Sequence, residues 1–305
     1  APASGAGKRQ ENVHTGVLAA LGAYGIWGAF PLMFRLLDGV NPVLIVAHRV
    51  VWSLVFVGGI LKWQGRMGEV YAALKDKKTV FVIFLSAALL AVNWLVFIWA
   101  IENERVLEVS LGYFINPLVN VLLGMVFLGE KQNKWQWLAI AIAVIAMGVQ
   151  TIGLGAPPYI SLALAMLFGL YGYLRKIVSV GSAPGLFIET LLMLPFALGY
   201  LGYVFVTSGA GVHGDPKLMT YLVLTGPATA GALLLFATAA RNLRLTTLGM
   251  FQYIAPTAHF LTAVWLFNEP LNVVQLISFC LIWISIGIYS FDSIAGREHR
   301  LEKVL

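Results

Sequence analysis

The sequence TVFVIFLSAALLAVNWLVFIWAI, residues 79–101, runs without a single Asp, Glu, Lys or Arg. A helix needs about 20 mostly apolar residues to cross the hydrocarbon core of a bilayer, and this stretch is long enough to do so. Hydrophobic residues make up 59% of the whole chain and charged residues only 11%, whereas soluble domains average roughly 45–50% and about 25%. The sequence therefore predicts an integral membrane protein built from helices.

Similar apolar stretches lie on both sides of residues 79–101. The ten predicted membrane spans are residues 15–34, 43–62, 79–101, 106–128, 135–152, 158–174, 184–206, 218–240, 246–267 and 271–291. Residues 1–14 are small or polar and are predicted to form a disordered cytoplasmic tail, and residues 292–305 form a second cytoplasmic tail. Between the second and third spans, apolar residues at helical spacing in segment 63–78 predict an amphipathic helix on the membrane surface.

Lys and Arg are distributed unevenly between the two sets of loops. With the first residues inside the cell, most of the 20 Lys and Arg residues fall in cytoplasmic segments, including Arg175 after the sixth span. Outer segments hold Arg35, Arg105 and Lys217. Because cytoplasmic loops are enriched in Lys and Arg, this bias predicts a multi-pass protein of a bacterial inner membrane with both termini in the cytoplasm. It also explains the net charge of +6, which therefore indicates no nucleic-acid partner.

The second half of the chain repeats the first. An ungapped shift that places Pro117 on Pro256 also aligns Ala100 with Ala239, Asn103 with Asn242, Arg105 with Arg244, Glu130 with Glu269, Gln136 with Gln275 and Gly148 with Gly287. With small gaps the match extends to Trp27-Gly28 on Tyr171-Gly172 and to Pro42 on Pro184. The alternative is a chance similarity between two apolar sequences.

The repeat predicts an architecture. Residues 15–152 and 158–291 each contain five of the predicted spans, and an odd number of spans inverts the second half relative to the first. The predicted fold is therefore an all-α integral membrane protein with ten transmembrane helices in two inverted five-helix repeats. Many secondary transporters have this architecture, with the substrate site near the midplane between the repeats.

Several motifs resemble a known family. They are AHRVVWS (47–53), SLGYFINPLVN (110–120), FLGE (127–130), GLFIETL (185–191) and TLGMFQYIAPT (247–257). They are similar to the RarD-type permeases of the EamA family in the drug/metabolite transporter superfamily, and the resemblance extends over roughly residues 15–292. It implies ten helices, a cytoplasmic-membrane location and solute transport without a bound cofactor. Relatives in the wider superfamily export amino acids and metabolites. The sequence departs from the family pattern at Ala47, where a Thr is expected.

Arg49 is the first candidate for substrate binding, because a charged group inside a span is costly and therefore a functional candidate. Its guanidinium is a permanent charge with a planar donor fork that suits a carboxylate or a phosphate. Trp52 follows one turn later and is expected to cover the guanidinium or to stack on a substrate. The alternative is a structural arginine that pairs with carbonyls or extends toward the interface.

Glu189 and His48 are the candidates for proton coupling. Glu189 lies in the seventh span near its cytoplasmic end, and the repeat aligns it with Ala47, next to His48. Carboxylate and imidazole groups both gain and lose protons near neutral pH when their surroundings favour it. Because Arg49 lies near the outer side, an ion pair between Arg49 and Glu189 is not expected. The alternative role for Glu189 is a hydrogen bond to a neighbouring helix.

Pro117 and Pro256 lie near the middle of the fourth and ninth spans. A proline leaves the carbonyl four residues earlier without its helical donor, and such a carbonyl is tolerated at membrane depth where it lines a cavity or meets a neighbour. The predicted cavity residues around these positions are Tyr113, Asn116, Asn120, Gln252, Tyr253 and His259, and Asn93 in the third span is a weaker candidate. The alternative is a pair of structural kinks.

Other chemistries are missing from the sequence. It contains no G-x-x-x-x-G-K-[S/T] motif for nucleotide hydrolysis and no Cys and His cluster with zinc spacing. We therefore expect no cofactor, no metal and no enzymatic activity. An enzyme would need an acid and a base within reach of each other, which Arg49 and Glu189, at different depths, do not supply.

The leading hypothesis is a secondary transporter that works as an exporter. Its substrates would be small polar or amphipathic metabolites such as amino acids or drug-like solutes, and its halves would alternate access around a midplane cavity. Its partners would be the small-molecule substrate, the lipid bilayer and, as candidate coupling ion, the proton. An uncoupled facilitator of the same solutes is one alternative, and a membrane-embedded enzyme or lipid-handling protein is another. The sequence indicates no oligomeric state.

Overall fold

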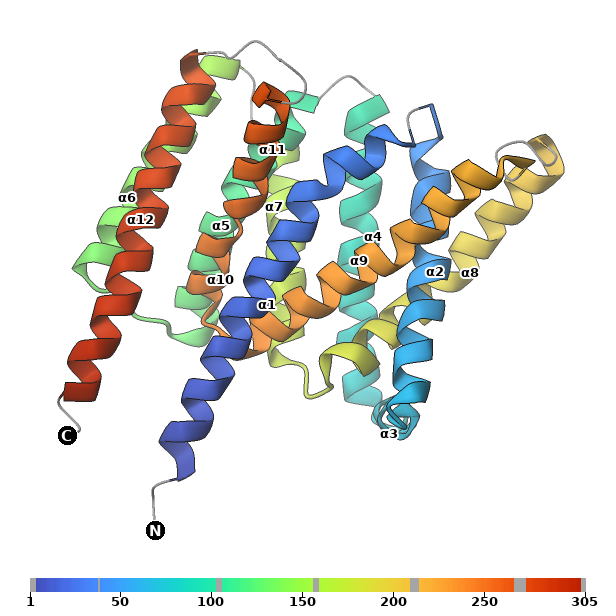
Figure 1. Cartoon of the computed structure of the whole chain (residues 1–305), viewed down its shortest axis with the longest axis horizontal. Helices are drawn as coiled ribbons and strands as arrows, with labels where there is room; N and C mark the ends of the chain where they lie inside the picture. Colours follow the sequence, from blue (N-terminus) through green and yellow to red (C-terminus); the bar gives the residue numbers. More distant parts are fainter. Residues whose placement is uncertain are drawn as a thin grey trace.

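The computed structural model describes residues 4–37, 39–102, 106–155, 159–208, 214–265 and 273–302. Within these ranges the protein is helical and contains no strand. The helices are α1 (Ser4–Arg35), α2 (Pro42–Trp63), α3 (Met67–Lys75), α4 (Lys77–Glu102), α5 (Val106–Leu128), α6 (Lys134–Leu154), α7 (Tyr159–Ile177), α8 (Ser182–Ser208), α9 (Pro216–Asn242), α10 (Leu245–Phe251), α11 (Ile254–Trp265) and α12 (Val273–Glu302). Figure 1 shows one bundle, in which most helices run in similar directions and α8 and α9 cross them diagonally.

Capping residues explain where several helices begin. The side chain of Asn41 accepts the backbone N–H of Val43 at 2.8 Å, and Pro42 is the first residue of α2. Asp215 has the same role before α9, where Pro216 is the first residue. Asn and Asp satisfy free N–H groups at helix starts, and proline is favoured at the first helical position because it lacks an N–H.

Seven described helices are long and apolar enough to cross a membrane. They include the segments Val13–Phe34, Pro42–Trp63, Lys77–Phe97, Lys134–Gly153, Tyr159–Ile177, Ser182–Thr207 and Pro216–Asn242. The predicted spans at 106–128 and 271–291 contain the shorter apolar helical segments Gly112–Leu128 and Leu276–Tyr289. The predicted span at 246–267 is divided between α10 and α11. These helices identify a multi-pass membrane protein.

The two ends of the chain lie on the same side of the bundle. Figure 1 shows the beginning of α1 and the end of α12 at one end, which is also where α3 lies. This arrangement agrees with an even number of membrane crossings. Helix α1 begins at Ser4 and α12 continues to Glu302, so both helices extend into the regions predicted as tails. Extending an existing helix costs less than starting one.

Helix α3 occupies the segment predicted to be amphipathic, and it packs on the bundle. Val70 and Ala73 are buried, whereas Tyr71 and Leu74 are exposed. The buried face contacts α8 and α4. This helix therefore covers the ends of its neighbours at the side of the bundle that carries the chain termini.

Apart from those of α3, the main contacts between helices of the two chain halves come in pairs. Helix α1 packs on α9 and α7 packs on α4; α5 packs on α7 and α11 on α1; α2 packs on α9 and α8 on α4. Exchanging α1 with α7, α2 with α8, α4 with α9 and α5 with α10 and α11 converts each contact into its counterpart. The contacts of α2 with α8 and of α6 with α12 are their own counterparts.

Gly226 brings α9 into backbone contact with α2. A Cβ atom at this position would lie 2.2 Å from the Cβ atom of Trp52 and 2.8 Å from the backbone nitrogen of Ser53. The hydroxyl of Ser53 donates to the carbonyl of Gly226 at 3.0 Å. Small residues permit this kind of close approach between membrane helices.

Replacing Gly226 tests this contact. We expect Gly226→Ala to lower the melting temperature of the purified protein in detergent, because α9 must move away from α2 and overpacking costs about 1–3 kcal/mol. Gly231→Ala is the control in the same helix, since a Cβ atom there would meet nothing within 4 Å. The control should be neutral or stabilising because Ala favours helix over Gly by about 1 kcal/mol. Equal melting temperatures for the two variants would contradict the prediction.

Candidate functional site

Arg49 lies where α1, α2, α4 and α9 meet. Its Nε donates a hydrogen bond to Oγ1 of Thr229 in α9 at 2.8 Å. The guanidinium carbon lies 5.0 Å from the ring centre of Trp94 in α4, and 5.7 and 5.9 Å from the rings of Phe30 and Phe34 in α1. Cations within about 6 Å of an aromatic ring are attracted to it. The guanidinium is therefore held by side chains from three other helices.

The terminal edge of the Arg49 guanidinium is unused by the described part of the chain. Among those residues, no hydrogen bond involves Nη1 or Nη2, and the ion pairs formed there are Arg66–Glu69, Arg175–Glu189 and Arg244–Glu130. The phenol of Tyr113 in α5 is close enough to interact electrostatically with Arg49, and Tyr113 is 45% exposed. A fixed cation thus presents two free donors beside a tyrosine of α5.

Trp52 does not cover Arg49. Its indole Nε1 donates to Nδ1 of His48, one turn earlier, at 3.3 Å, and His48 is buried. The side chains that surround the guanidinium are Trp94, Phe30 and Phe34 instead. Their approach depends on how α1 and α4 pack against α2, which the spacing of residues within α2 does not reveal.

Glu189 is fully buried and has a counter-ion that the sequence reading missed. Its Oε1 lies 3.6 Å from Nη1 of Arg175 and accepts a hydrogen bond from the hydroxyl of Ser86 in α4. Its Oε2 accepts a hydrogen bond from the hydroxyl of Tyr171 in α7 at 3.5 Å. Glu189 therefore joins α4, α7 and α8.

The assignment of Arg175 to a cytoplasmic loop was wrong. Arg175 is fully buried within α7, and its Nη2 donates to the carbonyl of Ser182 at 3.1 Å. Gly185 makes room for it, because a Cβ atom there would lie 2.3 Å from Nη1. An arginine near the end of a span extends outward when solvent is near, but here an acid in the next helix draws it inward.

The predicted cavity residues of α5 and the following repeat meet each other. Nδ2 of Asn120 donates to Oε1 of Gln252 at 2.7 Å, and the hydroxyl of Tyr253 donates to the carbonyl of Phe114 at 3.3 Å. The side-chain oxygens of Asn116 and Asn120 are buried without a hydrogen-bond partner in the described residues. They are acceptors that a polar solute could use, because buried polar atoms are normally paired.

The two repeat-related prolines have different effects. Pro117 lies inside the continuous helix α5, whereas α10 ends at Phe251 and α11 begins at Ile254, just before Pro256. Pro256 cannot donate to the carbonyl of Gln252, and its ring crowds that carbonyl. The interruption places Gln252 and Tyr253 against α5.

The remaining predicted residues are less informative. Asn93 donates to the carbonyl of Leu164 in α7 at 3.0 Å and therefore joins two helices. His259 belongs to α11, but its side chain lies outside the described part of the structure. The predicted residues thus form an Arg49 group and an amide group around Asn120. Tyr113 lies one turn before Pro117 on α5 and is adjacent to both groups.

An aromatic cluster lies between the Arg49 group and Glu189. Its members are Tyr24, Trp27, Phe168, Tyr171 and Phe236. Trp27 lies before Phe30 in α1, and Phe236 lies after Thr229 in α9. Tyr171 stacks on Phe236 at 5.9 Å and also contacts Glu189. The cluster therefore fills the core between the two charged centres.

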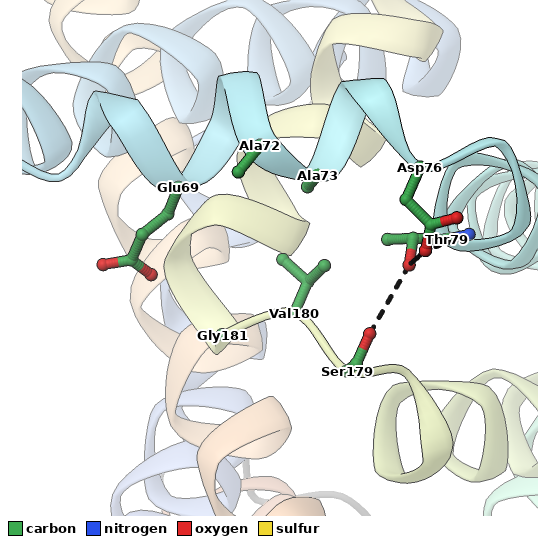
Figure 2. A pocket seen from close by; sticks show the side chains of 8 residues that line it. All are labelled: Glu69, Ala72, Ala73, Asp76, Thr79, Ser179, Val180 and Gly181. Carbon is green, nitrogen blue, oxygen red and sulfur yellow. Dashed lines mark hydrogen bonds between the residues drawn. The ribbon is translucent and has the colours of Figure 1, made fainter.

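A cavity of about 330 Å³ lies elsewhere, between α3 and the segment that joins α7 to α8. Figure 2 shows its lining residues, Glu69, Ala72, Ala73, Asp76, Thr79, Ser179, Val180 and Gly181. A hydrogen bond from Arg66 lowers the pKa of Glu69, and a hydrogen bond from Thr79 lowers that of Asp76. These carboxylates already have partners, so we assign no site to this cavity.

Glu130 joins the two chain halves at the end of the bundle where the termini lie. Its Oε1 accepts the backbone N–H of Leu245, the first residue of α10, at 2.7 Å, and its Oε2 lies 3.7 Å from Nε of Arg244. Arg244 in turn donates to the carbonyl of Lys131 at 2.7 Å. A carboxylate at a helix start is favourable because it meets free N–H groups and the positive end of the helix dipole.

The pair of Arg175 and Glu189 yields a stability prediction. Removing one partner of a buried ion pair costs about 3–5 kcal/mol because the other charge stays buried alone. We therefore expect Arg175→Gln and Glu189→Gln each to lower the melting temperature strongly in detergent, and the double variant to recover most of the loss. Additive losses would show that the two side chains do not stabilise each other.

The chain is similar to known membrane transporters over nearly its whole length. The model of the EamA-like transporter family matches residues 14–151. The protein RarD of Salmonella typhi is 44% identical over 287 residues, which cover 93% of this chain and 97% of that protein. An uncharacterized transporter of Vibrio cholerae is 41% identical over 293 residues, with 95% and 97% covered. A solved crystal structure of 17% identity aligns with a TM-score of 0.70 over 91% of this chain and 97% of that chain, which shows a shared fold.

Proposed function

Because the chain belongs to the RarD-type permeases of the EamA-like transporter family, we propose that it is a secondary transporter that exports small polar or amphipathic metabolites across a bacterial inner membrane. Amino acids and drug-like solutes are the expected substrates. The proposal rests on the surroundings of the Arg49 guanidinium. A guanidinium fixed by Thr229 and three aromatic rings, with two free donors, is suited to bind a solute inside the bundle.

Paired helix contacts support alternating access. The contacts of α1, α2, α4 and α5 with the other half have counterparts related by exchange of the halves, as an inverted repeat of five spans would produce. In such a protein, two arrangements of nearly equal energy expose one central site to each side in turn. Arg49, Trp52, Tyr113, Asn116, Asn120, Gln252, Tyr253 and His259 would line that site, with Asn93 at its edge.

Two observations disfavour the alternative of a membrane-embedded enzyme. Arg49 and Glu189 belong to separate groups, and Arg175 already compensates Glu189. Family and relatives point to transport. An uncoupled facilitator would use the same site, and only an imposed ion gradient distinguishes it from a coupled exporter. Glu189 and His48 stay the proposed proton-coupling groups.

Transport by the purified protein in liposomes tests the proposal. We expect wild-type protein to move members of a panel of labelled amino acids and drug-like solutes. Arg49→Lys should reduce the initial rate at least tenfold, because lysine keeps the charge and loses the planar fork. Arg66→Lys is the matched control, since Arg66 belongs to an exposed pair with Glu69. Unchanged transport by Arg49→Lys would exclude Arg49 as a bidentate ligand.

The same liposomes with an imposed pH gradient test coupling. If protons are exchanged for the solute, either His48→Gln or the double variant of Glu189→Gln with Arg175→Gln should lose the response to the gradient. The double variant avoids leaving Arg175 alone in the core. A wild-type response in both proteins would exclude these groups, and no response in the wild type would favour the facilitator.

Glu130 supports a prediction about the side of the bundle that carries the termini. If the contact of Glu130 with Leu245 and Arg244 holds this side closed, Glu130→Ala should expose residues behind it. In a Cys280→Ala background, a cysteine introduced by Ala240→Cys, at a fully buried position, should then react several times faster with a maleimide. Glu69→Ala is the control. Equal labelling rates with and without Glu130 would show that the contact has no gating role.

A further inference from the structure

Helices α2 and α8 exchange under the repeat, and each carries one charged side chain with similar surroundings. Arg49 of α2 bonds to the hydroxyl of Thr229 in α9, and Glu189 of α8 bonds to the hydroxyl of Ser86 in α4. Arg49 also contacts rings of α1, and Glu189 contacts side chains of α7. The two centres therefore use equivalent helices but have opposite charges.

The two charged centres differ in their counter-ions. Glu189 is compensated by Arg175. The alignment of Trp27-Gly28 with Tyr171-Gly172 makes Pro31 of α1 the repeat equivalent of Arg175, and proline carries no charge. Within the described ranges, no carboxylate lies at ion-pair distance from Arg49. A charge inside a span is costly without a partner. An anion that binds beside Arg49 would therefore neutralise its charge, as Arg175 neutralises the charge of Glu189.

The contacts of Arg49 also select how such an anion binds. A guanidinium accepts a carboxylate in two ways, along the edge formed by Nε and one Nη or along the terminal edge formed by Nη1 and Nη2. Thr229 already takes Nε at 2.8 Å. Only the terminal edge offers two free donors, and Trp94, Phe30 and Phe34 lie around the group.

We infer that the transported solutes are organic carboxylates, with the carboxylate bound to Nη1 and Nη2 of Arg49 and an apolar or aromatic body placed against Trp94, Phe30 and Phe34. This inference rests on the proposed transport function and names its substrate class. A solute without an anionic group leaves Arg49 uncompensated. A cationic solute is repelled by it.

Matched acids and amides test the inference directly. The probes are phenylacetate, indole-3-acetate and hexanoate, each compared with its own amide, which has the same body without the charge. Binding is measured as the rise in melting temperature of the purified full-length protein in low-chloride detergent buffer, because a ligand that prefers the folded state stabilises it. We expect at least one acid to bind at least tenfold more tightly than its amide.

Variants locate the binding group. Arg49→Gln should abolish the preference for the acid and weaken its binding about 10–100-fold, as expected for charge-assisted hydrogen bonds. Arg49→Lys keeps a charge and covers the case in which Arg49→Gln does not fold; it should bind the acid more weakly and still prefer it to the amide. Arg66→Gln removes an exposed arginine and should bind as the wild type does.

Several outcomes overturn the inference. They are equal binding of all three acids and their amides, a preference for acids that persists in Arg49→Gln, and stabilisation by chloride that equals that by the acids. Transport assays with the same probes separate the two proposals. If neutral or cationic solutes are carried and no acid is bound or carried, the transport function stands and the substrate class is wrong. If acids bind through Arg49 and no solute crosses the membrane, the binding site stands and the transport function is wrong.

Discussion

A charged group inside a membrane span needs a partner, and this requirement organises the centre of the protein. Glu189 satisfies it by pairing with Arg175, whose side chain extends from the end of α7 into the bundle. The two side chains and Ser86 join three helices. Arg49 satisfies it only in part, through one hydroxyl and three rings. The two unpaired donors of the guanidinium indicate which chemical group a bound solute would have to supply.

The rest of the bundle keeps these two centres apart. Five aromatic side chains fill the space between them. At the side that carries the termini, the contact of Glu130 with α10 joins the halves again. The charged centre in α2 and the compensated pair in α8 therefore lie at different depths of the bundle.

Much of the fold follows from residues that act locally. The apolar stretches predict helices that the structure contains. Of the two repeated prolines, Pro256 follows an interruption between α10 and α11, whereas Pro117 lies inside the continuous helix α5. The partners of Glu189 and Arg49 could not be predicted from the sequence, because they belong to other helices. Arg175 illustrates the difficulty: its position near the end of a span is compatible with a loop, and only the acid of α8 and the missing side chain of Gly185 bring it into the core. Trp52 has the right spacing to reach Arg49, but His48 on the same helix is its partner.

The glycine contact between α2 and α9 has a mechanical meaning. Backbones that touch at Trp52 and Gly226 leave no room for the helices to slide past each other, so α2 and α9 are packed as one body. That body contains pieces of both repeats, since α9 comes from the second half and leans on α1 and α2 from the first, while α4 leans on α7 and α8. The packing units are thus mixed, because each half of the chain contributes a helix that packs on helices of the other half. The hydrogen bond from Arg49 of α2 to Thr229 of α9 lies within this body, so the packing of the two helices fixes the orientation of the guanidinium.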